Sequence, residues 1–278
     1  MAALDLIRVP YDCGRRDVRL GLGPRALVDG GVRRSLEEAG HEVLVRSVEL
    51  DGDGFGEVPT AVALQGRTVG AVREALEGGR LPVIFAGNCH LAALGALGAL
   101  ERPAVLWLDA HGDLNTPETS SSGYFDGMSL AVVTGRCYRG LASRLEGFTP
   151  LSDEAVALLG ARDLDPGEAE ILERSAISRL GVDDLDRLPG LLARWAADRR
   201  SLYLHLDLDV LDPEVLVCNP WAAAGGLRRD GLLEVMRSLH RALPPVILGV
   251  TAYGPDFDRS QRGPGLVAEA LGRLLARA

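Results

Sequence analysis

The residues best suited to chemistry in this chain follow an apolar run at 104–108. Asp109, His111 and Asp113 come directly after it, at every second position. Alternate residues of an extended chain point to the same side, so these side chains can face one spot. Carboxylates and imidazoles gathered in this way are typical ligands of divalent metal ions.

Two further apolar runs end in side chains of the same kind. One ends in Asp207 and Asp209, and another is followed by Cys89 and His90. In a parallel sheet the carboxyl ends of the strands meet at one edge, where ligands bind. Carboxylates gathered there would repel one another and raise their pKa values, unless divalent cations neutralised them. The alternative is that strand ends are polar only because they meet water, with Asp favoured in turns.

Strand and helix patterns alternate along the whole chain. Apolar runs predict strands at 4–9, 42–50, 81–87, 104–110, 155–161, 201–210 and 245–253. Amphipathic runs and capping signals predict helices at 23–40, 61–79, 91–100, 165–175, 230–243 and 263–278. Repeated strand–helix units predict an α/β fold with a parallel sheet covered by helices on both faces. No tract resembles a linker, so we expect a single domain over residues 1–278.

Composition narrows the class of partner. The net charge of −9 argues against nucleic acid or an anionic membrane as the main partner. The partner that we expect is a small-molecule substrate. The four cysteines are widely spaced without a CxxC pair, which is typical of reduced thiols in the cytoplasm. We expect neither a signal peptide nor a membrane span, because no apolar run has the required length or flanks.

Taken together, these motifs resemble those of the arginase superfamily, the ureohydrolases. The segment "DAHGDLNTPETSSSG" is similar to the family's DAHxDxN signature, and "LHLDLDVLDP" with a later "GGL" to its SxDxDxxDP signature. The segments "VPYD…GLGPRALVDGG" and "LLGARDLDPGE" are similar to two further family patterns. The resemblance covers nearly the whole chain. It implies a three-layer α/β/α fold with a mainly parallel, roughly eight-stranded sheet, two manganese ions, and a homo-oligomer, commonly a trimer or hexamer.

The resemblance also implies a set of metal ligands. The family's bridging carboxylates fall on Asp109 and Asp207, and its remaining matched ligands fall on His111, Asp113 and Asp209.

The sixth ligand is open between two neighbours. The family's Gly-Gly-Asp-His segment matches "AGNC" without gaps, which puts Cys89 at the ligand position, and a shift of one residue puts His90 there. A cysteine at this place resembles the hydroxyarginine-hydrolysing branch, and a thiolate favours softer metals such as Zn²⁺. The alternatives are a small buried hydrophobic role for Cys89 and a surface position at a helix start for His90.

Two matched positions depart from the family where it would bind or protonate substrate. Asp126 stands in place of a histidine and, with Asp113, is a predicted catalytic residue; as an acid at neutral pH it needs a pKa above the ordinary value of about 3.9. The glutamate that holds the guanidinium falls on Ala252 or Gly254, neither of which pairs with a cation.

Other residues are predicted to contact substrate. Asp256 and Asp258 lie near the missing glutamate and either replace it or cap a turn. Trp221 stands in place of a threonine, which would change the shape of the pocket. Further substrate contacts, each with a structural alternative, fall on Asn115 (a turn residue), Ser122 (a loop hydroxyl) and Asp165 (a helix cap).

The favoured function is a binuclear metal-dependent hydrolase of a non-peptide C–N bond in a guanidino, hydroxyguanidino or amidino compound. Two metals would lower the pKa of a shared water and supply hydroxide near neutral pH. One alternative is a zinc deacetylase-like amidohydrolase that uses Asp109 or Asp207, with His111 and Asp209. The other is a non-catalytic metal-binding protein, because the guanidinium glutamate and the histidine are missing.

Overall fold

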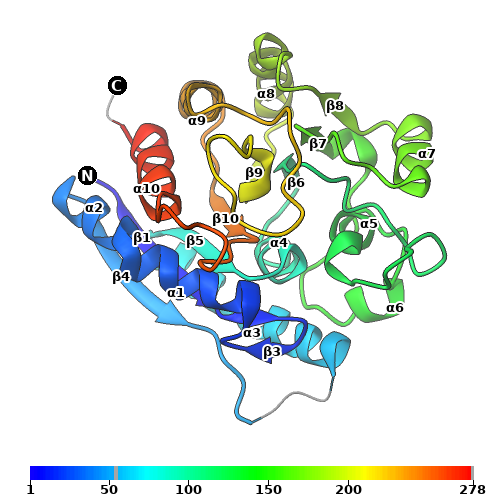
Figure 1. The fold of residues 1–278 in the computed structure, drawn as a ribbon, viewed down its shortest axis with the longest axis horizontal. Helices are drawn as coiled ribbons and strands as arrows, with labels where there is room; N and C mark the ends of the chain where they lie inside the picture. The colour runs from blue at the N-terminus through cyan, green and yellow to red at the C-terminus, as the bar shows by residue number, and fades with distance from the viewer. Residues whose placement is uncertain (53–55, 277–278) are drawn as a thin grey trace.

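The computed structural model describes residues 1–52 and 56–276 and is built on one large sheet. Its strands lie in the order β4-β1-β5-β10-β9-β6-β7-β8, and every neighbouring pair is parallel (Figure 1). In that order they span Glu42–Ser47, Ala3–Val9, Leu81–Ala86, Ile247–Thr251, Ser201–Asp207, Pro103–Leu108, Val156–Leu159 and Ser178–Leu180. A separate hairpin pairs β2 (Tyr11–Asp12) with β3 (Arg15–Arg16). The parallel α/β sheet expected from the sequence is confirmed.

Helices cover both faces of this sheet. They are α1 (Gly23–Leu27), α2 (Arg33–Glu38), α3 (Glu57–Glu77), α4 (Cys89–Leu97), α5 (Ser129–Val133), α6 (Arg139–Ala142), α7 (Pro166–Arg174), α8 (Leu188–Ala197), α9 (Arg229–Ala242) and α10 (Gly263–Leu274). One apolar core lies between the sheet and α1, α2, α8, α9 and α10, and a second lies between the sheet and α3, α4 and α5. The three-layer architecture is therefore confirmed.

Two predicted elements differ in the structure. The helix expected at 23–40 is split into α1 and α2 by a π-helical turn, where Gly31 adopts a φ of 147°. The strand expected at 201–210 ends at Asp207, because a 3₁₀ turn over Leu208–Val210 follows and the Asp207 carboxylate accepts the amide N–H of Asp209. Strand β8 and helices α5 and α6 are short, and the sequence did not predict them. Helix α8 was also not predicted, although its buried residues Leu188, Leu191, Leu192 and Trp195 recur at helical spacing. The end of the expected helix 263–278 at residues 277–278 lies outside the described residues.

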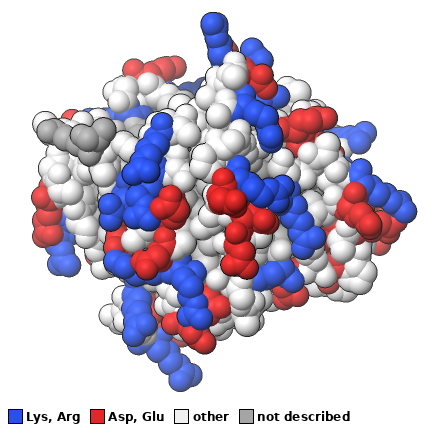
Figure 2. All heavy atoms as spheres, turned by 90° about the horizontal axis from the view of Figure 1, so that it is seen from above, with Lys and Arg blue, Asp and Glu red and all other residues white. Residues whose placement is uncertain are grey.

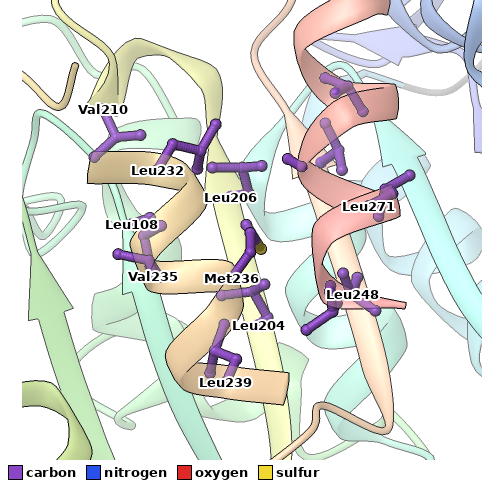
Figure 3. Close-up of a cluster of buried hydrophobic side chains, with 14 of the residues drawn as sticks. Leu108, Leu204, Leu206, Val210, Leu232, Val235, Met236, Leu239, Leu248 and Leu271 are labelled. Atoms are coloured by element: carbon purple, nitrogen blue, oxygen red, sulfur yellow. The ribbon is translucent and has the colours of Figure 1, made fainter. Parts of the chain in front are cut away.

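Alternation along β9 assigns one set of side chains to the core and another to the site. Leu204 and Leu206 pack under α9, beside Leu271 of α10 (Figure 3). Tyr203 belongs to the opposite core, on the side of α4. Because successive side chains of a strand alternate between faces, Asp207 follows Tyr203 to the α4 side.

Charged side chains of both signs lie on the face of the molecule that is shown in Figure 2. Figure 2 shows arginines and acidic side chains intermixed over one face of the molecule. No described helix combines the length and the apolar character needed to cross a lipid bilayer.

Gly87 follows the last residue of β5 and precedes the predicted ligand Cys89 by two residues. A substitution at Gly87 tests how closely the backbone is packed there. A Cβ at Gly87 would lie 2.2 Å from the Tyr11 carbonyl oxygen and 2.9 Å from the Gly21 nitrogen. We expect Gly87→Ala to lower the free energy of unfolding by about 1–3 kcal/mol, since backbone must move. Gly66→Ala in α3 meets nothing within 4 Å and should instead stabilise by about 0.4–1 kcal/mol. Urea denaturation of both variants checks this, and equal stabilities would contradict it.

Candidate metal centre

A cavity of about 240 Å³ opens where the central strands end. Its wall includes six of the predicted metal ligands: Cys89, Asp109, His111, Asp113, Asp207 and Asp209. It also includes five residues predicted to act in catalysis or to contact substrate: Asn115, Ser122, Asp126, Asp165 and Trp221. The structure thus brings eleven predicted residues together, whereas His90, Asp256 and Asp258 do not belong to the described cavity wall.

One group of ligand atoms comes from Asp109, His111 and Asp209. Their ligand atoms lie within 4.8 Å of one another, with His111 Nδ1 3.3 Å from Asp109 Oδ1 and 3.4 Å from Asp209 Oδ2. Asp109 is fixed further by the His111 backbone N–H, which donates to its Oδ1 at 2.7 Å.

A second group overlaps the first at Asp109. It contains Cys89, Asp109, His205 and Asp207, again with ligand atoms within 4.8 Å. Cys89 Sγ lies 3.1 Å from Asp207 Oδ2. Two overlapping groups that share one carboxylate have the form of a site for two cations.

The charges of the cluster fit cations as well. Burial, and then the neighbouring carboxylates, raise the pKa values of Asp109, Asp113 and Asp207. One oxygen of Asp113, Oδ2, is buried without a hydrogen-bond partner. A divalent ion would supply both the missing partner and the missing positive charge, so the donor set fits such ions.

In the protein without bound metal, His111 places a positive charge next to Asp109 and Asp209. Burial by itself would lower its pKa, but hydrogen bonds and attraction to Asp109 and Asp209 raise the pKa of His111 to about 12. Burial favours neutral Asp209, yet its hydrogen bond and attraction to His111 hold the pKa of Asp209 below its ordinary value. A metal ion bound by His111 would take over this role, since ligation requires the neutral imidazole.

The side chains of Cys89 and His90 point in different directions, and only the first of the two faces the cavity. Cys89 begins α4 and faces the cavity, whereas His90 points into the core. His90 Nδ1 lies 3.3 Å from Gln65 Nε2, and its ring centroid is 4.5 Å from that of Phe125. Burial lowers the pKa of His90 to about 3. His90 is therefore a core residue here, because consecutive residues of a helix point about 100° apart.

Asp126 lies in the cavity wall and also holds the start of α4. Its Oδ1 accepts the Cys89 backbone N–H at 2.6 Å and the Ser129 hydroxyl at 3.1 Å, and its Oδ2 accepts Asn88 Nδ2 at 2.9 Å. Burial raises the pKa of Asp126 to about 7, against the lowering effect of these donors. The shift has the direction that a proton carrier needs, and the same contacts give Asp126 a structural role.

Some of the residues predicted to contact substrate form hydrogen bonds with one another or with their neighbours. Asn115 Nδ2 donates to Asp165 Oδ2 at 2.9 Å, and Thr119 Oγ1 donates to Asn115 Oδ1 at 3.0 Å. Asp165 also caps α7 in a capping box with Glu168, as the sequence indicated. Ser122 is exposed at the rim, where its Oγ accepts the Tyr124 N–H at 3.2 Å.

The acids expected to replace the missing glutamate lie elsewhere. Ala252 lines the cavity, whereas neither Asp256 nor Asp258 belongs to the described cavity wall. Asp258 is buried against the start of α10, where it accepts the Tyr253 hydroxyl at 2.9 Å and the Gly263 N–H at 2.7 Å. For Asp258, the capping alternative is the one that the structure supports.

Several cavity residues were not identified from the sequence. Tyr124 stacks on Trp221 with ring centroids 5.4 Å apart, and Asn219 Nδ2 donates to Asp209 Oδ2 at 2.9 Å. Glu168 and Asp163 also line the wall. Asp163 and Glu168 stand in the segment "LLGARDLDPGE", whose likeness to a family pattern could have found them. His205 belongs to the second group of ligand atoms but not to the described cavity wall, and its signal is its alternation with Asp207 on β9.

Comparison with known proteins identifies the family. The family model described as "Arginase family" matches residues 2–276. The chain belongs to the arginase family. It is 31% identical to an arginase of Brevibacillus brevis over 76% of either chain. An arginase structure from Bacillus cereus superposes with a TM-score of 0.87, at 27% identity and 99% coverage of both chains.

A more distant relative shares the fold. The agmatine ureohydrolase of Thermoplasma volcanium superposes with a TM-score of 0.70 at 16% identity, covering 98% of this chain and 88% of that one. The family and its fold confirm the enzyme class predicted from the sequence, a metal-dependent C–N hydrolase.

The shared carboxylate gives the first test of the site. Asp109→Asn should weaken metal binding by at least about 100-fold, more than the loss of an outer hydrogen-bond partner costs, because both ligand groups lose a charged oxygen. Metal content per chain, measured by elemental mass spectrometry, reports the loss. Asp256→Asn is the matched control, since Asp256 is exposed and outside the cavity wall. Full metal content in Asp109→Asn would refute the site.

Proposed function

We propose that this protein is a binuclear metal-dependent hydrolase that cleaves a non-peptide C–N bond in a guanidino, hydroxyguanidino or amidino compound. The main support is the pair of overlapping ligand groups that share Asp109 in the wall of the cavity. The proposed ligands are Cys89, Asp109, His111, Asp113, Asp207 and Asp209. Manganese is the favoured metal for the oxygen-rich set, and the Cys89 sulfur makes Zn²⁺ the alternative.

Bound metal ions would supply an activated water and stabilise the charge that develops at the reacting carbon. The chain itself supplies orientation and proton transfer. Asp126 is the proposed proton carrier to the leaving amine, with Asp113 beside it, because both line the cavity. Asn115, Ser122 and Asp165 are the proposed contacts for polar groups at the far end of the substrate.

The substrate's cation cannot pair with a carboxylate at position 252, because Ala252 stands there. The cavity wall there offers only a methyl group, whereas Trp221 and Tyr124 present stacked aromatic rings. A planar cation is attracted to the face of such rings. We therefore place the planar guanidino-type group of the substrate against Trp221.

Two other functions remain as candidates. A non-catalytic metal-binding role is favoured by the position of Asp256 and Asp258 outside the described cavity wall. A mononuclear zinc deacetylase-like activity would use the group formed by Asp109, His111 and Asp209 alone. We also propose that the chain is a single cytoplasmic domain that forms a homo-oligomer, a trimer or hexamer.

Metal content separates these functions. Protein purified without chelators, then loaded with manganese and freed of excess, should hold two ions per chain by elemental mass spectrometry. Hydrolysis of guanidino and hydroxyguanidino compounds, followed by the release of urea or its analogue, should accompany them. One zinc ion with release of acetate would favour the deacetylase-like activity, and two ions without any hydrolysis would favour the binding protein.

Trp221 provides a test of cation recognition. Trp221→Thr should raise KM by about 2- to 30-fold with little change in kcat, the range expected when about 0.5–2 kcal/mol of cation–π attraction is lost. Trp221→Phe keeps an aromatic face and is the matched control, with a KM closer to that of the wild type. If both variants bound substrate like the wild type, the aromatic contact would be excluded.

A further inference from the structure

Beneath the proposed ligands lies a layer of polar side chains that the chemistry above does not use. The strand register places Trp107 beside His205, and Asp207 beside Thr251. Trp107, His205 and Thr251 have no exposed surface. Trp107 precedes Asp109 by two residues, and its indole Nε1–H donates to Asp109 Oδ2 at 3.0 Å. This layer is therefore in direct contact with the ligands.

A chain of hydrogen bonds connects the layer to two more of the proposed ligands, Cys89 and Asp207. Thr251 Oγ1 lies 3.3 Å from Cys89 Sγ and 3.5 Å from Asp207 Oδ2. His205 Nε2 lies 3.2 Å from Thr251 Oγ1, and His205 Nδ1 lies 2.9 Å from the Tyr203 hydroxyl. One buried path thus runs from Tyr203 to the cysteine and carboxylate of the site.

The protons along this path can be assigned from what each end accepts. The Asp207 carboxylate and a ligated Cys89 thiolate only accept hydrogen bonds, so the Thr251 hydroxyl donates to them. The Thr251 oxygen then accepts the N–H at Nε2 of His205. A neutral imidazole has a single N–H, so Nδ1 accepts from the Tyr203 hydroxyl.

The surrounding packing is shaped for this arrangement. The Trp107 ring stacks on the His205 ring at 3.7 Å with an interplanar angle of 16°, which fixes the plane of the imidazole. Gly249 leaves room for the Tyr203 hydroxyl, since a Cβ there would lie 2.2 Å from that oxygen. The strand sequence thus provides both the donors and the space that they need.

We propose that Trp107, His205 and Thr251 form a donor layer that positions Asp109, Asp207 and Cys89 of the proposed metal site. The three are positioning residues, because none belongs to the described cavity wall. This inference rests on the metal site proposed above. Hydrogen bonds from the layer orient the ligand atoms and draw charge from the sulfur, so the layer should affect metal affinity and the metal–sulfur bond.

The test removes one hydroxyl group and keeps the side-chain shape. Thr251→Val should weaken Mn²⁺ and Co²⁺ binding by about 10- to 100-fold in isothermal titration calorimetry. It should also shift the thiolate-to-cobalt charge-transfer absorption of the Co²⁺ protein. Thr251→Ser restores the hydroxyl and should bind close to the wild type. Thr68→Val is the matched control, since Thr68 is fully buried in α3 and its hydroxyl donates to the Leu64 carbonyl, away from the proposed ligands.

Trp107→Phe tests the second donor while keeping a ring over His205, and it serves if Thr251→Val does not fold. It should also weaken metal binding about 10- to 100-fold. Wild-type affinity and an unshifted cobalt absorption in both variants would overturn the donor layer and leave the proposed function standing. A wild-type chain that binds no metal would refute the proposed function instead.

The tautomer of His205 gives a readout besides metal affinity. Nitrogen NMR of histidine-labelled protein loaded with diamagnetic Zn²⁺ should show His205 with its proton on Nε2, and Tyr203→Phe should alter this signal. A proton on Nδ1 in the Zn²⁺-loaded wild type would overturn the hydrogen-bond order of the layer.

Discussion

Buried carboxylates that converge at the ends of two central strands are the constraint on which this structure depends. Asp109 follows β6 and Asp207 ends β9, and the two strands are hydrogen-bonded neighbours. Burial and mutual repulsion favour their neutral forms, while His111 and, from further out, Arg162 bring positive charge to the cluster. Bound cations would stabilise the charged form of such a site, so the fold favours metal binding at this place.

The period of the strand divides the structural and chemical tasks between the two faces of the sheet. On β9, Leu204 and Leu206 hold α9 and α10, while His205 and Asp207 turn toward α4. A shift of one residue would exchange the two sets and place carboxylates in an apolar core. The register that fixes the core therefore also fixes the site, and the donors beneath the ligands come from the same strands.

Several residues of the cavity wall depart from the family's pattern, whereas the fold that carries them is the family's. A thiol at position 89, a carboxyl at 126, a methyl at 252 and an indole at 221 all surround the same ligand cluster. For the function proposed above, the sulfur would favour softer metals, and the aromatic pair would offer a planar cation a flat, polarisable surface. The same frame thus carries a cavity wall whose side chain at Ala252 is a methyl group and not a carboxylate.

The sequence by itself determined the α/β fold, the family and the set of ligand types. These follow from local patterns: apolar runs with period two, and acids spaced at alternate positions after Leu108 and Leu206. Tertiary structure decided which neighbour faces the cavity. The first turn of α4 directs Cys89 inward and His90 into the core, and a turn after Asp207 sets the direction of Asp209.

Contacts between distant segments also required the folded chain. Asp258 is used at the start of α10, and Thr251 reaches Cys89 only because β10 lies beside both β5 and β9. Neither fact leaves a trace in local periodicity, because side-chain direction after a strand ends depends on the turn, and partner choice depends on strand order.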